Sequence, residues 1–297
     1  MLLQEEMKQT LFSNSERVII DFILKKQDEI RDYSTSQIAK ETYTSPSTLI
    51  RISKKLGFDG WLSFKEAFLD EVNYLNYHFT DIDANFPFDS QDSIMNIAAK
   101  IVNLHIESAK DTLSLIEHDS LQQAVQLINK SEHIHVFTIG NLNYIAQEFV
   151  LRLRRIKKDA TIYPLQGVMS HDAAMMTQKD CAICISYSGE TPMLLDIVQF
   201  LKDNEVPIIS LTSIGKNRLS SLSDISMHIT TREKSYKKIA SYSSMESITI
   251  LLDVLYSCLF NLNYQENLDY KFSIASKVEN NRIIKNEIIN DKEKWGL

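Results

Sequence analysis

The residues whose chemistry is easiest to interpret follow an apolar run in the second half of the chain. Residues 181–186 (CAICIS) have the composition of a buried strand, and Pro192 opens a helix shortly afterwards. The loop between them supplies hydroxyl groups, a permissive glycine and the N-terminus of that helix, a combination that holds a phosphate without a lysine. Such residues are also common in turns and caps. Because they are clustered here, we predict a phosphate site formed by Ser186, Ser188, Gly189, Glu190 and Thr191.

Two more polar loops follow apolar runs, at residues 137–143 and 210–213. In a parallel sheet such loops gather at the carboxyl edge of the strands, where ligands bind. His171, at the start of a predicted helix beside this edge, either bonds a ligand hydroxyl or is an ordinary histidine near a helix cap. The predicted ligand site therefore extends to Gly140, Asn141, Asn143, His171, Thr212 and Ser213.

The elements around these loops alternate in character. Apolar, partly β-branched runs interrupt helical patterns at residues 134–140, 160–164, 181–186, 206–213 and 225–230. This alternation predicts parallel strands joined by crossover helices. An apolar helix over 244–262 and a polar tail follow.

This half of the chain resembles the SIS (sugar isomerase) domain over roughly residues 105–262. The stretches IHVFTIG, SHDAAMMTQKDCAICISYSGET and LTS carry the resemblance. It implies an α/β three-layer, flavodoxin-like fold with a five-stranded parallel sheet, association into dimers, and recognition of phosphosugars through Ser186, Ser188 and Thr191. The first loop departs from the family pattern G-x-G-x-S, because residues 138–142 read TIGNL. Either Asn141 or Asn143 replaces the hydroxyl, or the ligand differs, or the site is weakened.

A second set of residues suggests DNA binding. Two short helices are predicted, one from Thr35 or Ser36 to about Thr42 and one over 46–56, with small Ala39 allowing a close crossing. The second helix has an apolar stripe, while its other face is basic and carries no acid. Arginine and lysine pair with guanine edges or phosphates, and serine and threonine with either. The alternative is a solvated amphipathic helix. We assign DNA contacts to Ser45, Ser47, Thr48, Arg51, Lys54 and Lys55.

This region, roughly residues 1–77, resembles the N-terminal helix-turn-helix domain of RpiR-type transcriptional regulators. The segment SQIAKETYTSPSTLIRISKKLGFDGWLSFK carries the resemblance. Tyr43 stands where the family usually has the turn glycine. Because a tyrosine with positive φ is strained, the turn is expected to be distorted or differently built.

Bulk properties are consistent with this division. A chain of 297 residues suits two domains, which we place at 1–77 (DNA binding) and 93–265 (SIS), with a linker at 78–92 and a polar helical tail at 266–297. The formal net charge of −7 disfavours non-specific nucleic-acid binding by the chain as a whole. No apolar run approaches the roughly 18 residues of a membrane span, so we expect no membrane partner and a cytoplasmic location.

The sequence suggests no cofactor and no metal. Cys181 and Cys184 form a CxxC, but they lie in the buried run, so we expect core cysteines. His133 and His135 alternate on a strand without a third ligand, which makes a metal site improbable.

The leading hypothesis is a transcriptional regulator, not an enzyme. It would bind operator DNA and a phosphosugar effector as a homodimer or homotetramer, and it would control sugar-metabolism genes. One alternative is a phosphosugar isomerase with a helical extension, which would need a base for proton transfer. The sequence shows no convincing Glu–His pair, and Glu246 is interpreted as a first-turn helix charge. Another alternative is a phosphosugar-binding module that acts on protein partners alone.

Overall fold

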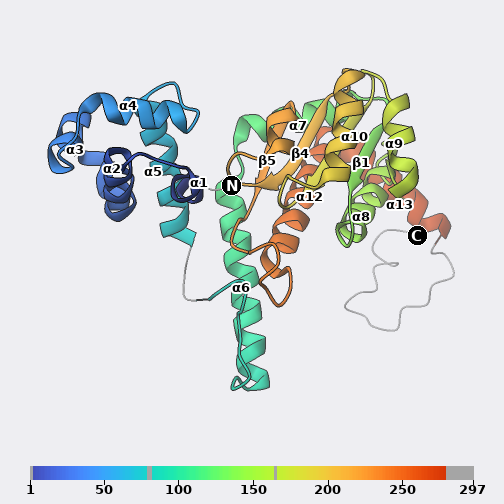
Figure 1. Cartoon of the computed structure of the whole chain (residues 1–297). Coiled ribbons are helices and arrows are strands. Elements are labelled where there is room, and N and C mark those ends of the chain that lie inside the picture. Colours follow the sequence, from blue (N-terminus) through green and yellow to red (C-terminus); the bar gives the residue numbers. More distant parts are fainter. Residues whose placement is uncertain (1–2, 79–81, 164–165, 279–297) are drawn as a thin grey trace.

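The computed structural model describes residues 3–78, 82–163 and 166–278. Figure 1 shows a helical N-terminal part beside a larger α/β part. The N-terminal part contains five α-helices and a 3-10 segment among its described residues: α1 (Leu3–Gln9), α2 (Asn14–Lys26), η1 (Gln27–Asp32), α3 (Thr35–Glu41), α4 (Pro46–Lys55) and α5 (Trp61–His78). The apolar periodicity of the sequence predicts a single helix over 15–31 with Ser15 as its N-cap, but the structure divides this segment into α2 and η1, and α1 was not expected.

Local capping explains where α2 begins. Ser13, rather than Ser15, is the N-cap, and the Ser13 N–H donates a hydrogen bond to Glu16 Oε2 at 2.8 Å, which completes a capping box. The apolar stripes of α2, α3, α4 and α5 then converge on one core. Its largest fully buried side chains include Ile19, Ile23, Leu49, Phe64 and Phe68.

Two long helices lead into the α/β part. They are α6 (Ile94–Leu115) and α7 (His118–Lys130). The sequence pattern is helical from Ser93 to about Asn129, and the structure shows that it breaks at residues 116–117. The first half of α6 projects from the α/β body in Figure 1. Most of the predicted linker, residues 82–92, consists of bends and turns, and residues 79–81 lie outside the described chain.

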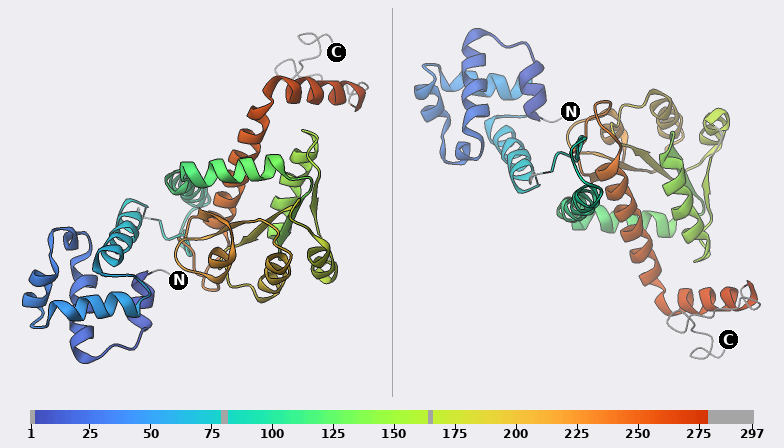
Figure 2. Two further views of the ribbon diagram at one scale, coloured as in Figure 1. Left: turned by 90° about the horizontal axis from the view of Figure 1, so that it is seen from above. Right: turned by 90° about the horizontal axis from the view of Figure 1, so that it is seen from below.

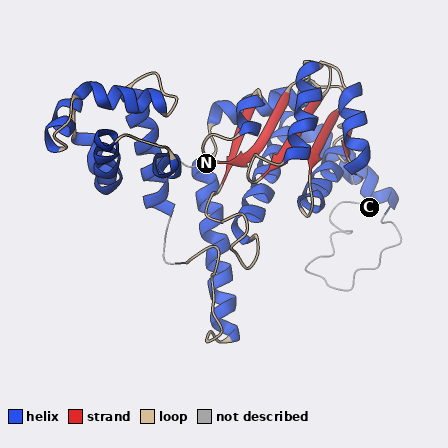
Figure 3. Cartoon of the chain, in the orientation of Figure 1, coloured by secondary structure: helices blue, strands red, loops and turns tan. Residues whose placement is uncertain are grey.

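The α/β part contains one five-stranded parallel sheet, as predicted, in the order β2-β1-β3-β4-β5. The strands are β1 (Ile134–Thr138), β2 (Ala160–Ile162), β3 (Cys181–Ser186), β4 (Ile208–Ser213) and β5 (Ile225–Ile229). The connecting helices are α8 (Leu142–Arg154), α9 (Gln166–Met175), α10 (Pro192–Asp203) and α11 (Arg218–Leu222). Figure 3 shows helices on both faces of the sheet, which is the three-layer arrangement expected of a parallel sheet.

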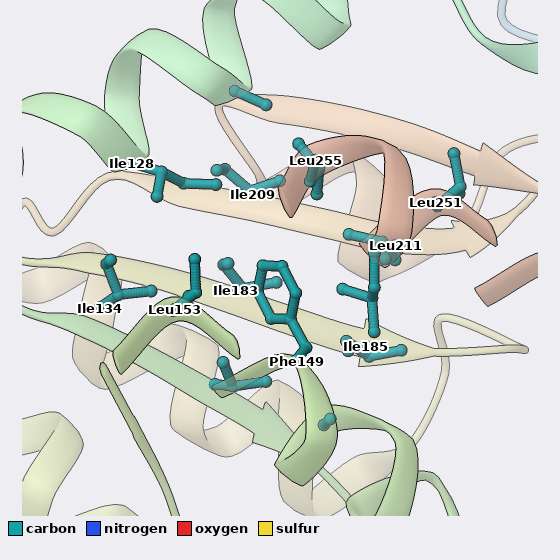
Figure 4. Close-up of a cluster of buried hydrophobic side chains, with 14 of the residues drawn as sticks. Ile128, Ile134, Phe149, Leu153, Ile183, Ile185, Ile209, Leu211, Leu251 and Leu255 are labelled. Atoms are coloured by element: carbon teal, nitrogen blue, oxygen red, sulfur yellow. The ribbon is translucent and has the colours of Figure 1, made fainter. Parts of the chain in front are cut away.

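Alternate residues of each strand enter different cores. Ile183 and Ile185 of β3 pack with α7, α8 and the later helix α12 (Tyr242–Leu262), in the cluster that Figure 4 shows. Ala182 and Cys184 instead face α9 and α10 on the other side. Cys181 and Cys184 therefore belong to different cores, and burial raises the pKa of Cys181 to about 12. The prediction of core cysteines is confirmed.

Among the described residues, α12 alone is long and apolar enough to cross a membrane by length and composition, which the sequence analysis did not anticipate. In this fold α12 contacts α6, α7, α8 and β5, and Leu251, Leu252 and Leu255 are buried in the sheet core. It is thus placed as a core helix. The last described helix, α13 (Tyr264–Val278), follows it at the end of the molecule away from the N-terminal helices in Figure 2. The rest of the predicted tail lies outside the described residues.

Candidate functional site

The turn between α3 and α4 is regular despite Tyr43. Tyr43 has φ +52°, the left-handed conformation that glycine would adopt. The Thr44 N–H donates to the Ala39 carbonyl at 2.8 Å and the Tyr43 N–H to the Lys40 carbonyl at 3.3 Å, which is the hydrogen-bond pattern of a Schellman cap. The expected distortion is therefore wrong: the backbone keeps the glycine geometry, and the tyrosine adopts the strained φ with its side chain 97% exposed.

The second helix of this pair, α4, presents most of the predicted DNA contacts to solvent. Ser45, Ser47, Arg51, Lys54 and Lys55 are exposed. Thr48 is the exception and corrects the prediction, since it is 7% exposed and its Oγ1 lies 3.0 Å from Ser45 Oγ. Its position one residue before Leu49, on the edge of the apolar stripe, turns it inward.

An acidic residue from another helix lies against this basic face. Glu16 of α2 accepts a hydrogen bond from Arg51 Nε at 2.8 Å, and Lys55 Nζ is 3.4 Å from its other oxygen. The hydrogen bond from the Ser13 backbone, together with those from Arg51 and Ser13 Oγ, lowers the pKa of Glu16 to about 2. The carboxylate is thus charged at neutral pH. Sequence reasoning missed this contact.

The predicted phosphate loop is held by its own hydroxyl groups. Ser186 Oγ lies 2.9 Å from Thr191 Oγ1 and accepts from the Gly189 N–H at 3.2 Å, while Ser188 Oγ accepts from the Glu190 N–H at 3.2 Å. Thr191 is the N-cap of α10, so the loop ends at a helix N-terminus. These hydroxyls still have capacity to donate to an anion.

A pocket of about 250 Å³ opens at this loop. It lies where β1 and β3 end, and Asn141 of the first loop lines it together with Ser186, Ser188 and Thr191. The remaining lining residues include Ile139, Leu142, Tyr187, Ser235, Lys238 and Ser241.

Three of these lining residues, Ser235, Lys238 and Ser241, come from the segment between β5 and α12, which the sequence did not indicate as part of the site. Lys238 Nζ lies 3.0 Å from Glu233 Oε2 and 5.0 Å from the centre of the Tyr187 ring. Glu233 in turn accepts the Ser243 N–H at 2.6 Å, at the start of α12. The basic run around Lys237 and Lys238 was the only sequence signal that pointed here.

Several predicted ligand residues do not line the pocket. Thr212 and Ser213 are buried behind the loop, where the Ser213 N–H donates to the Tyr187 carbonyl. Glu190 accepts the Arg218 N–H at 2.8 Å and lines a different hollow. In the first loop, Asn143 donates to the carbonyl of Gly140 and not toward the pocket. His171 is exposed on α9 and is not among the residues that line the pocket. For Thr212 and Ser213 the reason is directional, because a residue can end a strand at the ligand edge and still point into the core.

Glu246 also differs from its prediction. Its Oε2 lies 2.9 Å from His105 Nδ1 of α6, so the α/β part does contain a Glu–His pair. Neither residue lines the phosphate-loop pocket. Among the described residues no group of three or more His, Cys, Asp or Glu side chains is arranged to hold a metal ion.

A larger hollow, about 690 Å³, lies between the N-terminal helices and the loop after β4. Phe58 and Lys216 line it, with Lys216 Nζ 4.6 Å from the centre of the Phe58 ring. It contains none of the clustered hydroxyls of the phosphate loop, so size alone does not identify the ligand site.

Comparison with known proteins gives matches for both parts of the chain. Residues 1–73 match the sequence model described as "Helix-turn-helix domain, rpiR family", and residues 127–258 match that of the "SIS domain". An uncharacterized HTH-type transcriptional regulator of Clostridium perfringens is 29% identical over 272 residues, covering 90% of this chain and 95% of that protein. The uncharacterized HTH-type transcriptional regulator YbbH of Bacillus subtilis is 24% identical over 270 residues, covering 91% and 93%.

Solved structures show the same fold. The Vibrio vulnificus NanR protein complexed with ManNAc-6P aligns with a TM-score of 0.59 at 24% identity, covering 96% of this chain and all of that one (100%). The sugar isomerase domain of an RpiR transcription factor from Sphaerobacter thermophilus aligns with a TM-score of 0.54 at 16% identity, covering 60% and 97%.

Proposed function

Because the chain belongs to the RpiR family of helix-turn-helix transcriptional regulators and carries a SIS domain, we propose that it binds operator DNA through α4 and senses a phosphorylated sugar at residues 186–191. By this proposal it controls genes of sugar metabolism in the cytoplasm and is not an enzyme. The observation that carries the sensing half is the 250 Å³ pocket that three loop hydroxyls line together with Asn141 and Lys238.

The ligand class follows from the chemistry of this pocket. One end offers hydroxyls and a helix N-terminus, which suit a phosphate dianion. Asn141, Ser235 and Ser241 line the same pocket and offer hydrogen bonds to sugar hydroxyls. The relative with bound ManNAc-6P has the same fold, which supports a phosphosugar of hexose size as the first candidate.

The pocket wall also contacts the segment that leads to the DNA-binding helices. Asn85, in the linker, accepts hydrogen bonds from the Lys234 N–H at 2.6 Å and, through its carbonyl, from the Ile239 N–H at 2.9 Å. Lys234 Nζ lies 3.2 Å from Glu5 Oε1 of α1. A ligand that moves residues 235–241 would therefore move the residues that hold the linker at Asn85. The conformations with the linker held and with it released would then bind the ligand with different affinities, which is what signalling requires.

The experiment is a thermal-unfolding screen of the full chain against hexose 6-phosphates, N-acetylhexosamine 6-phosphates and pentose 5-phosphates. A ligand at about 100 times its dissociation constant stabilises the folded state by about 2.7 kcal/mol. Inorganic phosphate and the unphosphorylated sugars are the controls. Stabilisation by none of the phosphosugars would contradict the sensing half of the proposal. Failure to select any sequence from a random DNA pool would contradict the operator half.

We expect a homodimer or homotetramer. Paired recognition helices must reach half-sites about 34 Å apart. Ile94, Met95, Val102 and Ile106 of α6 are exposed and apolar, as in a helix that packs against a second copy. A stable monomer at micromolar concentration in light scattering would contradict this expectation.

The His105–Glu246 pair favours a second candidate, a phosphosugar isomerase. The glutamate could take a proton from a sugar carbon if a ligand reached the pair. Incubation with each stabilising phosphosugar, followed by NMR of the products, distinguishes the two. Turnover that is lost in Glu246→Gln would support isomerase activity, and unchanged sugar would support a sensor.

A further inference from the structure

Glu16 is placed to act on the DNA interface without contacting DNA. Its side chain is 6% exposed, whereas that of its partner Arg51 is 61% exposed, and 35 residues separate the two in sequence. The buried carboxylate belongs to α2, and the exposed guanidinium belongs to the recognition helix α4. The pair thus runs from the interior of the N-terminal domain to its surface.

The carboxylate is itself held in place. Oε2 accepts the Ser13 N–H at 2.8 Å, and Lys55 Nζ is 3.4 Å from the same oxygen and 4.9 Å from the centre of the Phe12 ring. These contacts come from the start of α2, the segment before it and the end of α4. Glu16 therefore offers Arg51 an acceptor at a fixed position.

Glu16 binds one nitrogen of the Arg51 guanidinium, and this choice of nitrogen determines which edge of the group is left to contact DNA. The hydrogen bond uses Nε, at 2.8 Å. The two Nη atoms form the far edge of the planar guanidinium, and they match the O6 and N7 acceptors of guanine in the major groove. An arginine that is held at Nε presents this edge in few rotamers, so it loses little side-chain conformational entropy when it binds DNA.

We infer that Glu16 is a positioning residue of the DNA interface: by holding Arg51 at Nε it aims the Nη edge at a guanine and makes that base contact selective. The inference rests on the proposed function, since it requires that α4 reads DNA. A purely structural pair would change affinity equally for every DNA sequence.

The test uses the sequence that the full-length wild-type protein selects from random DNA, together with variants in which each guanine pair is replaced by an adenine pair. We expect the wild type to lose about 5- to 150-fold in affinity at one guanine pair. In Glu16→Gln this discrimination should fall severalfold at that base pair and persist at the others. In an Arg51→Ala background, Glu16→Gln should have no further effect on discrimination.

Glu71→Gln is the matched control, because Glu71 is a similarly buried carboxylate of the same domain that accepts the Leu3 and Gln4 N–H groups instead.

A second measurement needs no variant at position 16. The Arg51 Nε–H NMR signal of the wild type, assigned by its loss in Arg51→Lys, should stay protected from exchange in the DNA complex. Unchanged discrimination in Glu16→Gln, an equal loss on all sequences, or loss of the Nε–H protection on binding would each overturn the inference. If the wild type selects no sequence, the proposed function fails instead.

Discussion

Two turns of this molecule share a backbone conformation but differ in what surrounds them. Tyr43 and Gly189 each have positive φ, +52° and +65°, and each lies three residues before a proline that begins a helix, Pro46 of α4 and Pro192 of α10. The first turn aims the proposed DNA-reading helix, and the second forms the proposed phosphate loop.

The difference is space. Tyr43 is 97% exposed, so its side chain meets solvent, whereas a Cβ at Gly189 would lie 2.0 Å from Asn217 Oδ1 and 2.8 Å from Thr212 Oγ1. Asn217 cannot easily move, because it is buried and its Oδ1 accepts the Ser220 N–H at 2.9 Å. The DNA-side turn thus tolerates a side chain at the cost of φ strain, and the ligand-side turn accepts only glycine.

The largest expected effect is at the ligand-side loop. Ser188→Ala with Thr191→Ala should weaken phosphosugar binding by about 3–6 kcal/mol, since each hydrogen bond to a charged group contributes about 1.5–3 kcal/mol. Binding of the ligand-free protein to DNA should be kept. Calorimetric titration with the phosphosugar from the thermal screen measures this, with exposed Ser273→Ala as the control. Binding at wild-type affinity would show that the phosphate lies elsewhere.

Gly189→Ala should destabilise the fold by about 2–5 kcal/mol, which combines the cost of left-handed alanine with overpacking against Asn217. Gly140→Ala is the matched control, because Gly140 has φ +75° but nothing within 4 Å of its virtual Cβ. It should lose only about 1–2 kcal/mol. Urea unfolding measures both. If both variants lost the same free energy of unfolding, the space around the added Cβ would not explain why position 189 requires glycine.

On the DNA side, Arg51→Ala should weaken binding to the selected operator by about 1–3 kcal/mol and relax preference at one base pair. Lys54→Ala should weaken binding on all sequences and reduce the salt slope by about one unit if Lys54 contacts a phosphate. Titrations at several salt concentrations separate the two. Unchanged affinity in both variants would rule out α4 as the reading helix.

Asn85→Ala should reduce the coupling between phosphosugar and DNA by about 1–2 kcal/mol, within the usual range of allosteric coupling. It removes the hydrogen bond from the Lys234 N–H but leaves the pocket residues in place. DNA titrations with and without the effector measure the coupling, and Asn103→Ala on exposed α6 is the control. A coupling equal to that of the wild type would mean that the signal does not pass through this anchor.

The smallest effect tests the other turn. Tyr43→Gly should stabilise the protein by up to about 1 kcal/mol, because relief of left-handed strain exceeds the added freedom of the unfolded chain. Tyr236→Gly provides the comparison, since Tyr236 is equally exposed but does not have positive φ. A rise in the urea midpoint at constant m is the expected result for Tyr43→Gly alone. A fall would mean that Tyr43 is not strained.

Regular patterns in the sequence were enough to predict most of the fold. The apolar runs that became β1, β3 and β5 are each short and continuous in the sequence, and the stripe of α4 repeats at the helical period, so near neighbours in the chain are enough to indicate these elements. The same holds for the hydroxyls at 186–191, because a strand end and a helix start lie within a few residues of each other.

Only the tertiary structure decided which polar side chains meet. Glu16 contacts Arg51 across 35 residues of sequence, and Asn85 contacts Lys234 across 149. Lys238 lines a pocket whose other lining residues include those at the carboxyl ends of β1 and β3. Conversely, Thr48 and Thr212 have the right residue type and position but turn inward. The physical reason is that local periodicity specifies which face of an element is buried, whereas a long-range contact depends on how separate elements pack and on which rotamer each side chain then adopts.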